Sequence, residues 1–223
     1  MRTLIVSRTI GGSGEKRCIG GITRLGDAVG NYHYTSIRLM KPGSHKGFWP
    51  KSAPCQIGDV WDLELEDLTD LEPPHVEDKF VRGGQRVTRL SNRELEHRLL
   101  EIAPSMIPTF YWEGGPHELF SGKLERSWTE KGFVTRTNTT DTSTGFWIPD
   151  SDLTLGCDPS GKFGYYHYGK WSDRSTVRYL KYVGEPKPIE LIPRETLVRV
   201  SLARWWIAGN HPEACWLMMS GWY

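Results

Sequence analysis

The chain has 223 residues, a formal net charge of +1 and 38% hydrophobic residues, which suits one large globular domain or two small ones. The near-neutral charge gives no global signal of nucleic-acid binding, and no apolar stretch approaches the length of a membrane-spanning helix. The 24 glycines and 14 prolines favour many short strands joined by turns over a helical fold.

Strand patterns and turn signals alternate along the first half of the chain. Period-2 alternation over 32–40 and 60–65 predicts half-buried strands, and the sequence Gln56-Ile57-Gly58-Asp59 predicts a turn into the second of them. Residues 11–17 and 41–54 combine glycine or proline with basic side chains, which predicts surface loops. Further strands are expected at 3–9 and, as one strand or two around Gly83-Gly84, at 79–90.

One helix is expected, over about 91–103. Ser91 can cap its first turn, and Glu94, three residues later, completes a capping box. Leucine and isoleucine side chains at helical spacing form an apolar stripe, and Pro104 ends the helix.

After this helix the pattern returns to short strands. Residues 162–168 are expected to pair with 176–183, and 185–188 form a stiff connector. Two final strands, 197–206 and 215–223, are expected to complete the sheet. Shorter segments that predict strands, turns or a linker lie at 110–112, 146–148 and 153–155.

Charge is distributed unevenly along the chain. Residues 1–51 carry nine Lys or Arg and two acidic residues, 52–78 carry nine acidic residues and no Lys or Arg, and 79–98 carry six basic and two acidic residues. Such alternation can focus an electrostatic field on one face although the sum is near zero. An ordinary solvated face for each block is the equally open alternative.

The four cysteines show neither a disulfide framework nor a zinc-finger spacing. They are expected to be reduced, buried thiols: Cys18, Cys55, Cys157 and Cys215. The first residues lack the long apolar segment of a secretory signal, so we expect a soluble, cytoplasmic protein without membrane association. The sequence predicts no cofactor and no metal site.

Four segments of the chain, taken in order, form a recognisable pattern. They are Arg2-Thr3-Leu4-Ile5-Val6 with a Gly/Lys/Arg loop into Cys18-Ile19-Gly20-Gly21, then Ile37-Arg38, then Gln56-Ile57-Gly58-Asp59-Val60 with Pro74-His75, and finally Val200-Ser201-Leu202-Ala203-Arg204 with Leu217-Met218-Met219-Ser220-Gly221-Trp222-Tyr223. In this order they resemble the bacterial dual OB-fold domain, a module found in conflict and defence contexts. Ser36-Ile37-Arg38-Leu39 departs from the Trp-Ile-Arg-Pro run expected there.

The resemblance implies an all-β fold of two OB-like barrels in tandem with one bridging helix. The first barrel plus the helix would span 1–105 and the second barrel 106–223. Because OB barrels bind oligomers through strand faces and two loops, the resemblance implies a binding role and no chemistry.

Single-strand binding requires cations for phosphates and aromatic platforms for bases. In 198–202 the even positions are apolar, so Arg199 is expected to face away from that core. A strand aromatic is more often core than platform, and a strand arginine more often forms a surface ion pair, so these alternatives stay open. The candidate nucleic-acid contacts are Lys16, Arg17, Arg38, Lys41, Lys46, Trp49, Tyr166, Tyr168, Lys170, Trp171, Arg174, Arg199 and Arg204.

Other chemistry finds weaker support in the sequence. His75 precedes two acidic residues, as a general base or metal ligand would, but a turn histidine is the favoured interpretation. The acidic run 59–78 lacks the glycine and bidentate glutamate of a calcium loop. The glycine-rich segment 11–16 does not match a phosphate loop.

Three functional hypotheses follow. The first is a non-enzymatic module that binds single-stranded nucleic acid or a nucleic-acid end, as the sensor or recruitment part of a bacterial defence-type system. The second is a protein–protein adaptor that docks an effector, which the near-zero net charge favours. The third, an enzyme with a site around His75, has the least support.

Overall fold

The computed structural model describes residues 1–11, 14–26, 32–44, 47–106, 110–169, 177–209 and 211–223. Two units separate by their internal contacts. Unit 1 comprises Met1–Glu72, Val76–Ile107 and Tyr223, and unit 2 comprises Pro73–His75 and Pro108–Trp222. Among the described residues, no helix is both long enough and apolar enough to cross a membrane.

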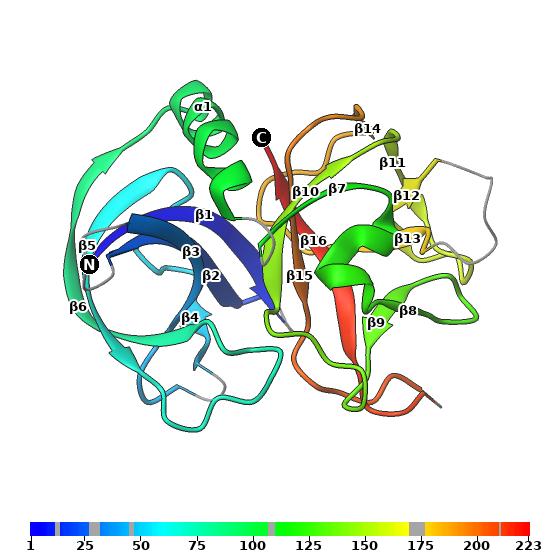
Figure 1. The fold of residues 1–223 in the computed structure, drawn as a ribbon, viewed down its shortest axis with the longest axis horizontal. Helices are drawn as coiled ribbons and strands as arrows, with labels where there is room; N and C mark the ends of the chain where they lie inside the picture. Colours follow the sequence, from blue (N-terminus) through cyan, green and yellow to red (C-terminus); the bar gives the residue numbers. More distant parts are fainter. Residues whose placement is uncertain (12–13, 27–31, 45–46, 107–109, 170–176, 210) are drawn as a thin grey trace. The chain divides into compact units, whose positions relative to one another are not determined.

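The strands of unit 1 are β1 (Arg2–Gly11), β2 (Lys16–Gly26), β3 (Tyr32–Met40), β4 (Trp49–Pro50), β5 (Asp59–Asp67) and β6 (Asp78–Arg89). Five of them follow the order β1-β5-β6-β3-β2, and pairing of β1 with β2 closes the barrel (Figure 1). β3 runs parallel to β6, whereas the other neighbouring pairs are antiparallel. This is the Greek-key arrangement of an OB barrel, as expected.

Alternation of apolar residues gives each strand of unit 1 an inner side. The barrel core consists of Ile5, Ile19, Ile37, Leu39, Ala53, Cys55 and Leu63. The predicted turn before β5 is present, because Asp59 N–H donates to the Gln56 carbonyl over 3.0 Å. Gly58 occupies this turn with φ +86°, a left-handed conformation that side chains other than glycine rarely adopt.

The acidic and basic blocks of the sequence meet across β5 and β6. Asp59 is in register with Arg89, whose Nε lies 2.7 Å from the Asp59 carboxylate. Asp67 is in register with Lys79 at the other end of the pair and forms an ion pair with it. Ion pairs between the two strands therefore neutralise the charges of these four residues. Residues 79–90, expected as one strand or two, form the single strand β6.

The expected helix is confirmed as α1 (Asn92–Ile102). The Ser91 side chain accepts from the Glu94 N–H, and the Glu94 carboxylate accepts from the Ser91 N–H, so the capping box is complete. A 3-10 helix, η2 (Ala103–Met106), follows directly. Three apolar residues at helical spacing are buried along α1: Leu95, Leu99 and Ile102.

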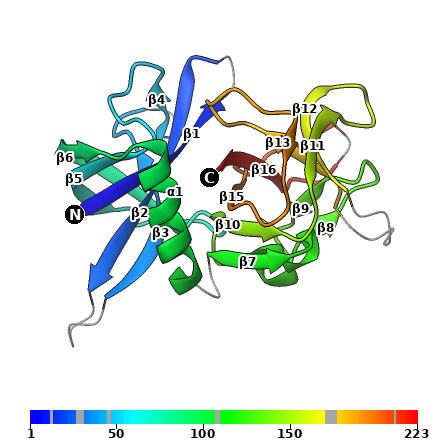
Figure 2. The same ribbon diagram turned by 90° about the horizontal axis from the view of Figure 1, so that it is seen from above.

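The elements of unit 2 are β7 (Tyr111–Gly114), the 3-10 helix η3 (Pro116–Gly122), β8 (Glu125–Arg126), β9 (Gly132–Val134), β10 (Thr144–Pro149), β11 (Leu153–Cys157), β12 (Phe163–Tyr168), β13 (Tyr179–Tyr182), β14 (Leu191–Ile192), β15 (Val198–Leu202) and β16 (Cys215–Trp222). Only residues 150–152 separate β10 from β11. In the strand order β11-β12-β13-β16-β15-β10, these two strands therefore stand at opposite ends although they are neighbours in the chain (Figure 2). β13 runs parallel to β16, as β3 does to β6, so unit 2 repeats the OB order.

Strand parity sets the inside of unit 2. Tyr166, Leu180 and Met219 are fully buried members of its core. Their immediate neighbours Tyr165 and Lys181 therefore lie on the outer face of the same strands. The predicted pairing of 162–168 with 176–183 is confirmed over the described part of the second segment.

Candidate functional site

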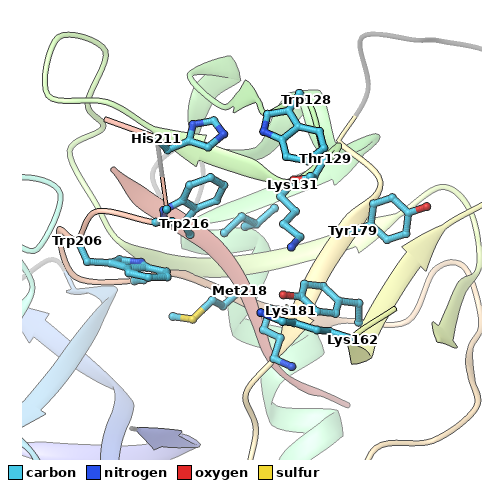
Figure 3. A pocket seen from close by; sticks show the side chains of 15 residues that line it. Trp128, Thr129, Lys131, Lys162, Tyr179, Lys181, Trp206, His211, Trp216 and Met218 are labelled. Atoms are coloured by element: carbon cyan, nitrogen blue, oxygen red, sulfur yellow. The ribbon is translucent and has the colours of Figure 1, made fainter. Parts of the chain in front are cut away.

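A pocket of about 470 Å³ lies on the outer face of β12, β13 and β16 in unit 2 (Figure 3). Its walls are the β8–β9 hairpin, the loop between β11 and β12, and the loop between β15 and β16. The residues that line it are Trp128, Thr129, Lys131, Lys162, Tyr165, Tyr179, Lys181, Ala203, Trp206, Ala208, Gly209, His211, Trp216, Leu217 and Met218.

The floor of the pocket is a row of side chains across three strands. Tyr165 on β12 is in register with Lys181 on β13, and Lys181 is in register with Met218 on β16. All three point away from the barrel core because their sequence neighbours occupy it. Strand alternation therefore gives the sheet that encloses the core a second, outer face.

Trp206 forms one aromatic wall. The residue is 51% exposed, and its backbone forms two hydrogen bonds with that of Ala214, of 3.1 and 3.2 Å. The Trp216 ring lies behind it, with centroids 6.5 Å apart, and His211 meets Trp216 edge-on at 5.1 Å. A held backbone with a half-exposed ring is what a stacking platform needs.

Trp128 contributes a second exposed ring at the tip of the β8–β9 hairpin. It is 82% exposed, and the turn that carries it closes through a 2.9 Å hydrogen bond from Ser127 N–H to the Lys131 carbonyl. The Glu130 carbonyl accepts from the Arg178 N–H over 2.8 Å, which ties the hairpin to the segment before β13. The hairpin is thus attached to the sheet that it overhangs.

Lysine ammonium groups surround the Tyr165 ring. Lys131 Nζ and Lys181 Nζ each lie 4.7 Å from its centroid. Lys131 also donates to Asp158 over 2.6 Å. Burial lowers the pKa of Lys181, and the positive charges of Lys131 and Lys162 lower it further, against the opposing effect of Asp158. Figure 3 shows Lys131, Lys162 and Lys181 directed into one region, with Trp206 and Tyr179 on opposite sides of the pocket.

Asp158 organises the loop between β11 and β12. Its Oδ1 accepts from the N–H groups of Ser160 and Lys162, each at 2.9 Å, and its Oδ2 from Lys131. Burial alone would raise the pKa of Asp158, but these donors hold it well below the usual range. One ionised carboxylate therefore positions two of the three pocket lysines.

OB barrels bind ligands through strands two and three and through the loops between strands one and two and between strands four and five. In unit 2 these are β12, β13, the loop with Lys162 and the loop with Trp206, so the pocket occupies the position that this fold uses. The model of the dual OB-containing domain family matches residues 1–222. The chain belongs to this family. No curated protein and no solved structure matches the chain.

In this dual OB-containing domain, the equivalent face of unit 1 is closed. Gly20, Ile22, Ser36 and Arg38 project from β2 and β3 on the side away from the barrel core, and all four are buried. The Arg38 Nε lies 2.6 Å from the Asp78 carboxylate. Burial by itself would lower the pKa of Arg38, yet the carboxylates of Asp78 and Glu77 raise it above its ordinary value.

Burial removes several sequence-predicted contacts from a solvent-facing interface. Tyr166 and Tyr168 are core residues whose hydroxyls donate to the Ile189 carbonyl over 2.8 Å and to Asp150 over 2.5 Å. Arg199 faces away from the apolar core as expected, but it is only 1% exposed, with its guanidinium 4.6 Å from the Phe146 ring centroid. Arg17 and Arg38 are buried as well.

The other predicted contacts lie apart from the pocket or outside the described residues. Trp49 is half-buried against the unit 1 core, and its Nε1 donates to the Leu39 carbonyl over 2.8 Å. Lys16 and Lys41 are exposed on unit 1, and Arg204 is half-buried. None of the described candidates lines the pocket. Four candidates lie outside the described residues: Lys46, Lys170, Trp171 and Arg174.

His75, for which the sequence favours a turn position, lies between two turns and is a buried residue of unit 2. It is 1% exposed, and its Nε2 lies 3.7 Å from the Cys215 sulfur, which is also fully buried. The acidic run is likewise engaged, since Asp59 and Asp67 pair with basic side chains of β6. Among the described residues, no cluster of three or more His, Cys, Asp or Glu could hold a metal ion.

Sequence reasoning missed the residues that form the pocket. The predicted contacts Tyr166 and Tyr168 lie on the core face of β12, whereas Tyr165 lies on its outer face. Aromatic rings lie on both faces of Phe163–Tyr168, so alternation in the sequence could not identify the core face, and only the core membership of Tyr166 and Tyr168 places Tyr165 on the outer face.

Proposed function

We propose that this protein is a non-enzymatic module that binds single-stranded nucleic acid through the pocket of unit 2. The observation that carries the proposal is the combination of exposed tryptophan rings with three lysines on the OB ligand face. Rings stack on bases irrespective of sequence, and ammonium groups pair with the phosphate backbone.

We infer that such a module serves as the sensor or recruitment part of a bacterial defence-type system. In this role, binding of a strand would recruit an effector protein encoded nearby. The module then needs no catalytic residue of its own, because recognition is its whole contribution.

A second candidate function is protein–protein docking. At the rim of the pocket, the exposed Trp206 is followed in the chain by Ile207, which does not line the pocket and is 65% exposed. Aromatic and aliphatic anchors of this kind are typical of protein interfaces. A partner that covers this rim would make the chain an adaptor rather than a nucleic-acid sensor.

The test is fluorescence anisotropy of labelled single-stranded DNA and RNA with purified protein. Trp206→Ala should weaken binding by about 1–3 kcal/mol, or roughly 5- to 150-fold, because one stacked base is lost. Ile207→Ala is the matched control, since it removes an adjacent exposed side chain that does not line the pocket.

Three results would count against this function or against its assignment to the pocket. The first is the absence of binding to either strand at low salt. The second is equal affinity for the wild type and Trp206→Ala, which would move the contact away from the pocket. If Trp206→Ala and Ile207→Ala weaken binding equally, the pocket has no special role.

A further inference from the structure

Among the described residues, three lysines and one carboxylate give the pocket a local excess of two positive charges. Lys131 is balanced by Asp158, at 2.6 Å. Among the described residues, neither Lys162 nor Lys181 forms an ion pair with a carboxylate. Lys181 Nζ donates instead to the Phe163 carbonyl over 3.3 Å. The positive charges of these two ammonium groups are therefore available to an anionic ligand.

The positions of these lysines are fixed by the fold. Asp158 holds the backbone N–H of Lys162 and the ammonium of Lys131 at the same time. Lys181 is fixed in register with Tyr165, whose ring lies 4.7 Å from both Lys131 Nζ and Lys181 Nζ. The three lysines thus line one pocket and do not form an extended row along the surface.

The dimensions of the pocket suit one nucleotide. Its volume of about 470 Å³ lies within the range of roughly 300–1,000 Å³ typical of pockets for small ligands. A continuous strand needs an extended groove, whereas a cavity of this volume suits a single base and its phosphate. Trp206, half exposed at its edge, can take that base.

We propose that the pocket captures the phosphorylated end of a single strand, with the terminal phosphate held by Lys131, Lys162 and Lys181. This inference rests on the proposed function and specifies its substrate. An internal phosphodiester carries one negative charge, whereas a phosphomonoester carries about −1.5 to −2 at pH 7. Only the terminal group matches an excess of two positive charges.

The electrostatics of the site agree with this match. The pKa of Lys181 is lowered by burial and by its two lysine neighbours, so the ammonium is destabilised in the empty pocket. A dianion among the three lysines relieves that repulsion, because opposite charges within about 4–6 Å favour the ionised form of both partners.

The experiment compares oligonucleotides of one sequence that differ only in their ends. Labelled strands with a 5′-phosphate, a 3′-phosphate or two hydroxyl ends are titrated with the intact protein at constant salt. We expect one phosphorylated end to bind about tenfold more tightly than the hydroxyl strand, as charge-assisted hydrogen bonds to a phosphate would give. The exposed Lys162→Gln should reduce this ratio, and Lys162→Gln/Lys181→Gln should bring it near one.

Lys187→Gln is the control, because Lys187 is an exposed lysine of unit 2 outside the pocket, and its ratio should equal that of the wild type. Equal binding of phosphorylated and hydroxyl strands would overturn the end-recognition proposal while leaving single-strand binding intact. An undiminished ratio in Lys162→Gln/Lys181→Gln would overturn the assignment to this pocket. Failure of every strand to bind would overturn the proposed function itself.

Discussion

Within unit 2, the position of a residue along its strand decides whether its side chain packs in the barrel core or lines the pocket. Tyr165 and Tyr166 are adjacent, yet the first lines the pocket and the second is fully buried in the core. The Tyr166 hydroxyl donates to the Ile189 carbonyl and accepts from the Ile189 N–H, at 2.8 and 3.1 Å. Two neighbouring tyrosines therefore contribute to different properties of the protein.

Tyr166→Phe should lower the free energy of unfolding by about 0.5–1.5 kcal/mol, because the two backbone groups of Ile189, which are only partly buried, lose their partner. Its affinity for single-stranded nucleic acid should equal that of the wild type. Urea unfolding and strand anisotropy measure the two quantities. A loss of affinity without a loss of stability would contradict the assignment of Tyr166 to the core.

Among the elements, the β5–β6 pair shows how charge supports the barrel of unit 1. The Asp59 carboxylate is fully buried and accepts from Arg89 Nε and from the Gln56 N–H, at 2.7 and 2.8 Å. Burial alone would raise the pKa of Asp59, but these hydrogen bonds lower it below its ordinary value. The same carboxylate therefore fixes the turn before β5 and the end of β6.

A lowered pKa at Asp59 makes stability depend on pH. The unfolded chain takes up the proton first, at about pH 4, so the contribution of Asp59 is fully present above that pH and is lost as pH falls toward the folded pKa. Asp59→Asn should be less stable than the wild type at pH 7, and the difference should shrink on acidification. Urea midpoints at pH 7 and about pH 3 test this, with the exposed Asp70→Asn as control. A constant difference across this range would contradict it.

For the whole molecule, a net charge of +1 hides a local cluster of lysines around the pocket of unit 2. Only a few lysines would meet phosphate, so salt should weaken binding far less than for a strongly basic protein. With one doubly charged terminal phosphate in the pocket, the slope of log K against log salt should be about −1.4, since each phosphate charge neutralised on a single strand contributes roughly −0.7.

Anisotropy titrations over a salt series measure that slope, and Lys162→Gln should make it shallower by about 0.7. A slope near zero would exclude phosphate contacts. A slope far steeper than about −1.4 would mean that exposed lysines beyond the pocket, such as Lys16 and Lys41 of unit 1, also bind the strand.

The sequence by itself determined the local structure and the family of this protein. The capping box of Ser91 and Glu94 predicted α1, because its hydrogen bonds join residues three apart. The glycine of the Gln56–Asp59 turn and the period-2 pattern of β5 are equally local signals. Together with four ordered motifs they were sufficient for two OB-like barrels.

Only the tertiary structure decided where a ligand can bind. Trp128, Lys162 and Trp206 lie on three separate loops, and no local rule places them around one pocket. Alternation gives a strand two faces but does not say which one the core takes when both carry aromatic rings, as in β12. Long-range pairing of β12, β13 and β16 fixes that choice, because it determines which side chains the barrel encloses and which it leaves outside.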